Sequence, residues 1–226
     1  MASRADRFVA KLKKFYGTLP APPSDAFTLF VWEILSNHSS DKKRSAAMAA
    51  LKKHGALTVD GMWNCPPRKI EESVALAGPY VAQRVQALKK GVEAFRRNPE
   101  LSSDIRRPHR EAMRALKGIP LMGGEGSGYR MLLFPGGQAV LPMDARFARV
   151  ATRLGYGQRD DVNFAKTAKS VRLAIARETR DSVGAYRELY IHFEHHGGAI
   201  CTESDPKCDE CQLVKDCPFA QSQHLR

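Results

Sequence analysis

The sequence predicts an all-α fold, and three observations support this. Apolar residues recur three or four positions apart over most of the chain, which places them on one face of a helix. Alternation of apolar and polar residues, the pattern of a strand, does not extend beyond about four residues. Helix-starting residues such as Ser, Asp and Pro stand directly before several of the periodic segments. A chain of 226 residues has room for one large domain or two small ones.

The first two helices follow from local signals. Residues 2–16 place three large apolar side chains on one helical face, namely Phe8, Leu12 and Phe15. A proline-rich stretch then breaks the chain. A Ser-Asp pair provides the cap of a second helix, 26–37, which is apolar on nearly all sides and is therefore expected to be buried.

The later helices are predicted in the same way. A third helix opens at Ser40-Asp41 and ends at His54, because Gly55 is a typical C-terminal stop. Prolines stand at the starts of two others. The remaining predicted helices are 59–63, 70–76, 80–97, 108–116, 145–154, 163–177 and 183–195. The segment 117–143 is rich in Gly and Pro and predicts turns around one short helix.

Composition and charge narrow the class of partner. Lys and Arg number 36 against 24 Asp and Glu, so the net charge is +12. A compact protein this basic most often meets a polyanion, and nucleic acid is the first expectation. No apolar run reaches the ~18 residues of a membrane-spanning helix. The N-terminus lacks the apolar core of a signal peptide, so we expect a cytosolic protein.

Four of the five cysteines are close together near the C-terminus: Cys201, Cys208, Cys211 and Cys217. In a reducing cytosol, clustered cysteines are more often metal ligands than disulfides. One C-x2-C pair flanked by two single cysteines is compatible with two bound groups. One is a zinc ion, although zinc sites usually have two such pairs, and the other is a [4Fe–4S] cluster held by four thiolates. Cys65 stands alone and is expected to be a small buried apolar side chain.

Four stretches outside the cysteine tail carry motifs of their own. They are Ile34–Asp41, Ala77–Tyr80, Leu116–Pro120 and Met143–Val150. Together with the spacing C-x6-C-x2-C-x5-C, they resemble, in the same order, the motifs of the endonuclease III family of helix-hairpin-helix DNA glycosylases. The resemblance covers the chain from about Phe27 to Cys217. It implies a base-excision-repair enzyme that flips a damaged or mismatched base and hydrolyses its N-glycosidic bond.

The same resemblance implies a two-lobed form of the all-α fold. Residues 25–135 are expected to form a six-helix lobe with the hairpin, and residues 1–24 and 136–226 a helical iron–sulfur lobe. The four clustered cysteines would hold a [4Fe–4S] cluster there. The expected partner is double-stranded DNA with a damaged, mismatched or abasic nucleotide, bound between the lobes. The protein would be a monomer in a bacterial or archaeal cytosol, associated with the nucleoid.

Two carboxylates are candidates for catalysis. Asp144 matches the catalytic aspartate of the family. Breaking an N-glycosidic bond builds positive charge on the sugar, and a carboxylate near C1′ stabilises that cation or activates a water. Asp144 is also expected to be a helix N-cap, and the two roles are compatible. Glu33 matches a glutamate of adenine-excising and some thymine-mismatch relatives, where it could protonate the leaving base. Alternatively, Glu33 pairs with an arginine in the core.

A missing lysine indicates the type of reaction. Bifunctional members of the family use a lysine just after the hairpin, whose amine attacks C1′ and allows strand cleavage. This chain has no lysine between Lys117 and Lys166. Ser127 or Tyr129 is expected at the lysine position, as in monofunctional members. We therefore expect a monofunctional enzyme in which AP lyase activity is weak or absent, with Tyr129 among the catalytic residues.

Five residues are expected to contact DNA. In the family motifs, His38 matches the residue that fills the space of the flipped base, and Pro79 matches an apolar wedge. The other three belong to the hairpin: Lys117, Gly118 and Pro120. Pro120 replaces the second glycine of the hairpin and lacks an N–H, which weakens the usual phosphate and cation site. Nearby glycines at 123, 124, 126 and 128 are expected to supply replacement N–H donors.

Three other functions remain open at the level of sequence. A displaced amine, such as that of Lys117, would make the enzyme a bifunctional glycosylase and AP lyase. The altered hairpin and the missing lysine also fit a protein that binds damaged or structured DNA without catalysis. Zinc in place of iron and sulfur would make the cysteine tail part of a DNA-binding module.

Overall fold

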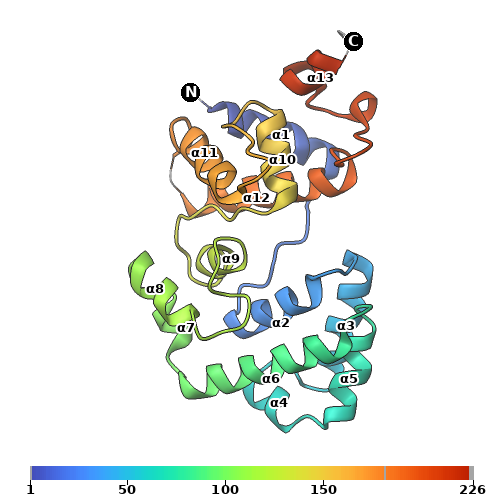
Figure 1. Ribbon diagram of the computed structural model, residues 1–226, viewed down its shortest axis with the longest axis vertical. Coiled ribbons are helices and arrows are strands. Elements are labelled where there is room, and N and C mark those ends of the chain that lie inside the picture. The colour runs from blue at the N-terminus through green and yellow to red at the C-terminus, as the bar shows by residue number, and fades with distance from the viewer. Residues whose placement is uncertain (1, 181, 224–226) are drawn as a thin grey trace. The chain divides into compact units, whose positions relative to one another are not determined.

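The computed structural model describes residues 2–180 and 182–223, and all regular structure within these residues is helical (Figure 1). The predicted all-α fold class is therefore confirmed. Within the same ranges, no helix combines the length and the apolar character that crossing a membrane requires. The chain divides into two compact units. One runs from Pro22 to Gln138, and the other joins the segment up to Ala21 with the segment from Ala139 onward.

The unit of residues 22–138 is built around one buried helix. Its helices are α2 (Ala26–Ser36), α3 (Asp41–Lys53), α4 (Val59–Asn64), α5 (Pro67–Ala75), α6 (Val81–Arg97), α7 (Leu101–Asp104), α8 (His109–Leu116) and α9 (Ser127–Leu133). α2 packs against α3, α6 and α9. Phe30 of α2 lies on Gly91 of α6, where a Cβ atom would meet the phenyl ring at 2.0 Å. Glycine at this position therefore permits the close approach of α2 and α6.

The predicted caps of this unit are present. The carboxylate of Asp25 accepts a hydrogen bond from the N–H of Thr28 at 2.8 Å, and Ser40 accepts one from Lys43 at 3.4 Å. These bonds satisfy N–H groups that the first turn of a helix leaves without partners. Gly55 follows α3 with a φ of 70°, a conformation that favours glycine.

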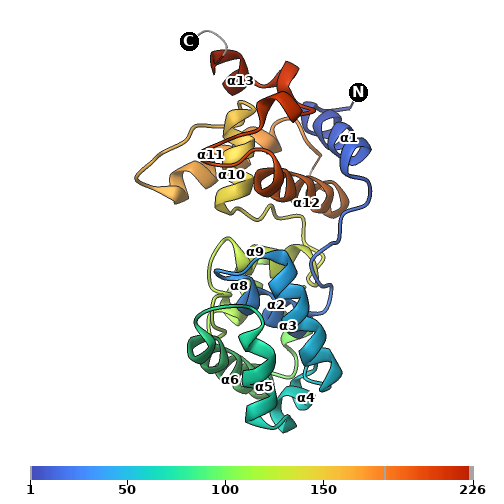
Figure 2. The ribbon, with the colours of Figure 1, turned by 90° about the vertical axis from the view of Figure 1, so that its right-hand side faces the viewer.

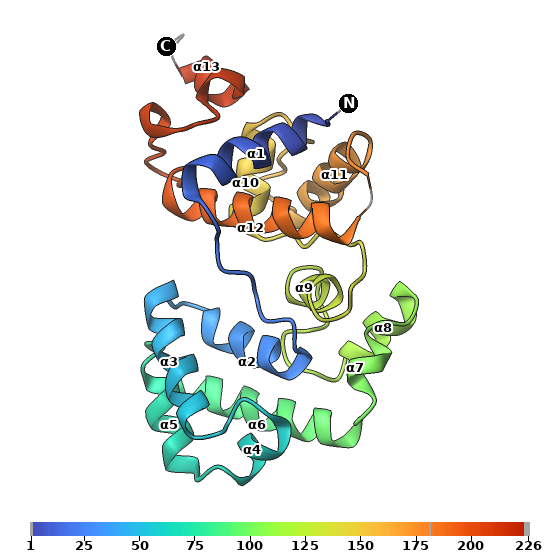
Figure 3. The ribbon, with the colours of Figure 1, turned by 180° about the vertical axis from the view of Figure 1, so that it is seen from behind.

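The second unit is built around α12, its longest helix. Its helices are α1 (Arg4–Tyr16), α10 (Ala145–Arg153), α11 (Phe164–Ala176), α12 (Val183–Ala199), the short 3-10 helices η1 (Cys208–Glu210) and η2 (Val214–Asp216), and α13 (Pro218–Gln223). α1 and α10 both pack on α12, and Figures 2 and 3 show α1 beside it. Phe8 and Leu12 of α1 are buried, as predicted. Phe15 is 47% exposed, contrary to its expected place on the buried face, and contacts the ring of Tyr16 edge-on at 4.8 Å.

Some helix boundaries differ from the predicted ones. The short helices α7 and α13 have too few residues for a periodic pattern. α5 begins at Pro67, three residues before its predicted start. α12 continues through Gly197 and Gly198 to Ala199. A Cβ atom at Gly197 would lie 2.9 Å from the backbone oxygen of Arg146. The packing of α10 on α12 therefore accounts for a glycine that local propensity would place at a helix end.

Candidate active site

Asp144 is the N-cap of α10, and both carboxylate oxygens accept hydrogen bonds. Oδ1 accepts the backbone N–H of Phe147 at 2.9 Å, which is the predicted capping bond. Oδ2 accepts the hydroxyl of Tyr190 on α12 at 2.7 Å. The side chain of Asp144 is half-buried. Two helices of one unit thus fix the orientation of this carboxylate.

Tyr190 is a site residue that sequence reasoning missed. Its side chain is 3% exposed, and its ring is stacked on Phe147 with centroids 6.0 Å apart and planes 16° from parallel. In the sequence it belongs to the apolar face of α12, so nothing distinguishes it from an ordinary core tyrosine. A buried tyrosine needs a partner for its hydroxyl, and that requirement was the available signal.

Glu33 is buried in α2 and engages α9. Arg130 donates from Nη2 to Oε2 of Glu33 at 2.7 Å, and from Nε to Oε1. The hydroxyl of Ser127 donates to the same Oε2 at 2.7 Å, and Nη2 of Arg130 lies 3.1 Å from that hydroxyl. Glu33 is 4% exposed, so this is a largely buried, two-pronged ion pair. It holds the start of α9 against α2 and orients Ser127.

Tyr129 lies in the first turn of α9, beside α8. Its hydroxyl is 3.3 Å from Nε2 of His109, and the two rings meet edge-on with centroids 5.1 Å apart. α8 and α9 are the two helices on either side of the predicted hairpin, and they pack on each other. The residues in the first turn of α9 are Ser127, Gly128, Tyr129 and Arg130. None of these four side chains carries a primary amine.

The hairpin between α8 and α9 exposes much of its backbone. A Cβ atom at Gly118, Gly123 or Gly124 would meet nothing within 4 Å. Lys117 is exposed, and Pro120 is half-buried. These glycines therefore face open space, in which another molecule can approach the backbone closely.

Two buried side chains, Ile119 and Met122, anchor the same hairpin. Between them Leu121 adopts a φ of 66°, which is strained for a residue other than glycine. Gly128 donates its N–H to the carbonyl of Gly124 at 3.0 Å, and a Cβ atom there would lie 2.4 Å from the carbonyl oxygen of Met122. The expectation that Gly128 supplies a replacement donor is therefore wrong, since its N–H is used inside the hairpin.

His38 and Pro79 lie on two neighbouring loops. His38 has a φ of 52° and Tyr80 a φ of 70°, and their rings are 5.2 Å apart. The buried guanidinium of Arg84 donates to the carbonyl of Asn37, and also to that of Pro79 at 2.6 Å. One arginine thus ties the loop that carries His38 to the loop that carries Pro79. Tyr80 is 51% exposed beside them and was not among the predicted DNA contacts.

Comparison with known proteins decides the fold. No model of a protein family matches the sequence, and no curated protein matches it closely enough to count as a relative. Solved structures do match. A thermostable thymine-DNA glycosylase superposes with a TM-score of 0.71 at 19% identity, covering 96% of this chain and 97% of that one.

Two structures of endonuclease III with DNA, one a trapped covalent intermediate and one a non-covalent complex, give the same TM-score of 0.71 at 16% identity. Each covers 96% of this chain, and the matches cover 96% and 95% of the endonuclease III chains. The chain has the endonuclease III-like, helix-hairpin-helix glycosylase fold. The similarity predicted from its motifs is thereby confirmed at the level of the fold.

The cysteine loop of this glycosylase fold gathers four thiols. Burial and, to a smaller extent, the charges of Cys201, Cys217 and Cys208 raise the pKa of the Cys211 thiol to about 11, against a lowering by the N–H of Leu213. Arg153 donates to Sγ of Cys201 at 3.3 Å. Within residues 2–180 and 182–223, no set of three or more His, Cys, Asp or Glu side chains is arranged to hold a metal ion. Thiolate sulfur is the ligand that iron–sulfur clusters and structural zinc sites take, so the chemistry of these side chains fits either group.

A chain of hydrogen bonds links this loop to α1 and α12. The hydroxyl of Tyr16 is 2.8 Å from Nδ1 of His196, and Nε2 of His196 is 3.4 Å from Sγ of Cys211. Burial lowers the pKa of His196 to about 4, so the imidazole is neutral near pH 7. If Tyr16 donates to Nδ1, the ring proton is on Nε2 and points at the sulfur. Cys211 is thus positioned by the helical core as well as by its own loop.

Cys65 lies in the other unit, away from the cysteine loop in sequence. It is 8% exposed, and burial raises the pKa of its thiol. This agrees with its predicted place as a small buried side chain.

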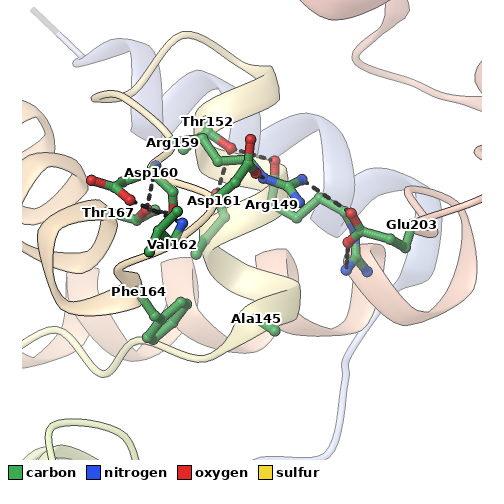
Figure 4. A pocket seen from close by; sticks show the side chains of 11 residues that line it. Ala145, Arg149, Thr152, Arg159, Asp160, Asp161, Val162, Phe164, Thr167 and Glu203 are labelled. Atoms are coloured by element: carbon green, nitrogen blue, oxygen red, sulfur yellow. Dashed lines mark hydrogen bonds and ion pairs between the residues drawn. The ribbon is translucent and has the colours of Figure 1, made fainter.

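A polar pocket of about 220 Å³ lies beside α10 in the same unit as the cysteine loop (Figure 4). Its charges are mutually paired. Arg159 contacts Asp161 at 2.6 Å and Glu203 at 3.0 Å, and Arg149 contacts Glu203 at 2.9 Å. Hydrogen bonds from Arg159 lower the pKa of Glu203. Asp144 does not line this pocket, so the pocket is not part of the candidate catalytic group. Its ion pairs hold the loop after α10 in place.

Proposed function

We propose that this protein is a monofunctional DNA glycosylase of base excision repair. Asp144 carries the proposal, because its carboxylate is held in one orientation by the N–H of Phe147 and the hydroxyl of Tyr190. A carboxylate positioned in this way is suited to stabilise positive charge on a deoxyribose. The glycosylase fold and the basic composition support the same substrate, duplex DNA with a damaged or mismatched base.

The proposed reaction breaks the bond between the base and C1′ and forms a bond between C1′ and water. As the base leaves with the bonding electrons, the sugar becomes an oxocarbenium-like cation that Asp144 stabilises. Water attacks C1′, and its proton passes to the carboxylate or to solvent while the base takes up a proton of its own. The products are a free base and an abasic site in an intact strand.

The first turn of α9 supports hydrolysis over lyase chemistry. A lyase needs an amine that forms an imine with C1′, and Ser127, Gly128, Tyr129 and Arg130 do not offer one. We assign Tyr129 to the lysine position of the family. The hydroxyl of Tyr129 shares a hydrogen bond with the imidazole of His109, and this bond orients the phenol.

For Glu33 we propose a positioning role ahead of proton donation. Both of its carboxylate oxygens are engaged by Arg130, and Oε2 also accepts the hydroxyl of Ser127. A carboxylate bound this way keeps α9 and its side chains in place for catalysis. That Glu33 protonates the leaving base stays a prediction, which would require the ion pair to open when DNA binds.

We also propose that Cys201, Cys208, Cys211 and Cys217 hold a [4Fe–4S] cluster. When bound, the cluster would cross-link the loop and would take no part in base excision. The chain's own part is to present the loop, and with it Lys207 and Lys215, to the DNA backbone. Purified protein with a brown colour and broad absorbance near 400 nm would support iron and sulfur, whereas colourless protein with one bound zinc would overturn it.

Contacts with DNA are assigned to the hairpin and to the paired loops. The exposed backbone around Gly118, with Lys117 beside it and Pro120 after it, is proposed to meet a phosphate. His38 and Pro79, tied together by Arg84, are proposed to occupy the space that the flipped base leaves.

Single-turnover excision on a panel of duplexes with damaged and mismatched bases tests the proposal. Release of at least one base, with the strand cleaved only after alkali, is the expected result. Cleavage without alkali, together with an adduct trapped by borohydride, would favour a bifunctional enzyme. Tight binding to a damaged duplex with no base released from any substrate would favour a non-catalytic DNA-binding protein.

A further inference from the structure

α8 presents a row of cations on its exposed face. Arg110, Arg114 and Lys117 follow one another at intervals of four and three residues, and all three are exposed. At 3.6 residues per turn, these positions lie within about 60° of each other around the helix axis. The opposite face of α8 is held in the core by Ala112 and Leu116. The row is therefore fixed in place by a well-packed helix.

These cations lack the carboxylate partners that other basic residues of the unit have. Arg68 and Lys69 share Glu72, at 2.9 and 3.4 Å. Within residues 22–138, all of which the structure describes, neither Arg110 nor Arg114 has a carboxylate within 4.0 Å. The same holds for Lys117. Such charges repel one another, and an anionic partner would relieve the repulsion.

A hollow of about 510 Å³ borders the row. It is lined by Asn98, Asp104, Arg107, Arg110, Glu111, Arg114 and Ala115. Asp104 is neutralised there, since it pairs with Arg107 at 3.1 Å and accepts from Asn98 at 2.8 Å. Glu111 is the carboxylate of the hollow without such a partner, and it lies at the margin of the row. The row and the hollow together make a concave basic surface rather than a convex solvated one.

The row continues directly into the hairpin. Lys117 follows the last residue of α8, and the open glycines come next. Figures 1 and 2 show α8 beside α9, on the other side of that hairpin. A polyanion that contacts the hairpin can therefore run on along α8 without leaving the unit.

We propose that Arg110, Arg114 and Lys117 form a second DNA-backbone contact, which binds duplex phosphates beyond the hairpin. From Arg110 to Lys117 the helix rises about 10 Å. Phosphates of one strand advance about 3.4 Å each along the duplex axis and also turn about it, so neighbours lie farther apart than this rise and the row spans about two of them. The inference rests on the proposed function, since DNA is the polyanion that it supplies. It assigns to α8 a contact that does not depend on the lesion.

Binding of undamaged duplex, measured by fluorescence anisotropy as salt rises from about 50 to 200 mM, tests the proposal. The variant Arg110→Ala/Arg114→Ala should flatten the slope of log K against log[salt] by about 1.8, which is roughly 0.9 for each lost phosphate contact. Both positions are exposed and alanine favours helix, so the fold is retained. Lys89→Ala/Lys90→Ala on α6 removes the same charge elsewhere and should leave the slope unchanged. Equal slopes in the two double variants would overturn the proposal.

A charge reversal provides the opposite test. Glu111→Lys adds a cation at the margin of the row and should tighten binding several-fold at low salt, with a steeper slope. Glu71→Lys on α5 changes the net charge equally at another exposed site and should tighten binding less. No difference between these variants would also overturn the proposal. Because the duplex carries no lesion, loss of excision on the damage panel would not affect either result, and the two hypotheses fail separately.

Discussion

The hydroxyl of Tyr190 on α12 donates a hydrogen bond of 2.7 Å to the carboxylate of Asp144 at the start of α10. The two residues are 46 positions apart in the sequence. The bond makes the orientation of Asp144 a property of how two helices pack, because Tyr190 is itself held by stacking on Phe147. The orientation of the proposed catalytic carboxylate thus depends on a tyrosine of the helical core, which is 3% exposed.

Replacing the carboxylate tests its place in the reaction. Asp144→Asn should lower single-turnover excision by about two orders of magnitude or more, the scale of lost electrostatic and acid–base help. Asparagine is as good an N-cap as aspartate, so the melting temperature and the DNA affinity should stay near those of the wild type. Excision close to the wild-type rate would remove Asp144 from the mechanism.

The hydrogen bond from Tyr190 can be removed while its aromatic ring is kept. Tyr190→Phe keeps the stacking on Phe147 and loses a bond to a charged acceptor, worth about 1.5–3 kcal/mol. We expect the single-turnover rate at saturating enzyme to fall about tenfold, with little change in DNA affinity. In the Asp144→Asn background the same change should have much less effect on the rate. Additive losses in the two variants would indicate a general structural role instead.

Local signals account for what could be predicted of the fold and site. The Asp25, Ser40 and Asp144 caps depend on residues three positions away, so a short stretch of sequence contains all the information. The motif around Asp144 placed the carboxylate correctly at a helix start. The third helix ends at Lys53, within one residue of its predicted end, because Gly55 is a stop that acts locally.

The partners of the site residues are not local. Arg130 meets Glu33 across 97 positions, and many arginines in a chain this basic were equally available as partners. Gly197 continues α12 because Arg146 of another helix leaves no room for a Cβ atom. Such relationships follow from the packing of the folded chain, which periodicity in one segment does not contain.

The ion pair between Glu33 and Arg130 should matter for stability. Removing one partner of a buried pair strands the other charge and costs about 3–5 kcal/mol. We expect Glu33→Gln to lower the melting temperature by roughly 10 °C, at a few degrees per kcal/mol for a chain of this size. Glu33→Gln/Arg130→Met removes both charges and should recover much of the loss. A melting temperature for Glu33→Gln equal to that of the wild type would contradict the role of this pair.

The cysteine loop can be tested without measuring activity. Cys211→Ala should abolish bound iron and the absorbance near 400 nm, and should lower the melting temperature, because the loop has few apolar side chains of its own. Cys65→Ala is the matched control, since Cys65 is buried in the other unit and is no proposed ligand. Iron content should be unchanged in that variant. Full iron content in Cys211→Ala would show that the ligand assignment is wrong.

The last prediction concerns Tyr129 and the absent amine. The wild-type protein should release a base and leave the abasic strand intact until alkali is added, since hydroxyl groups cannot form an imine. If Tyr129 occupies the lysine position, Tyr129→Lys should create a complex that borohydride traps, with some strand cleavage. The new activity should be weak. An amine needs a lowered pKa to be nucleophilic, and a carboxylate near the reacting sugar raises it, so exclusion of water by bound DNA would have to supply the shift.

Two controls separate the alignment from the chemistry. Ser127→Lys places the amine two residues earlier in α9 and breaks the hydrogen bond to Glu33, so it should give less trapped complex than Tyr129→Lys. Tyr129→Phe should keep hydrolysis near the wild-type rate if the phenol serves mainly to fill the lysine position. Strong strand cleavage by the wild-type protein, abolished by Lys117→Ala, would instead locate a lyase amine in the hairpin. In that case the reaction would proceed through an imine, and the monofunctional mechanism would have to be abandoned.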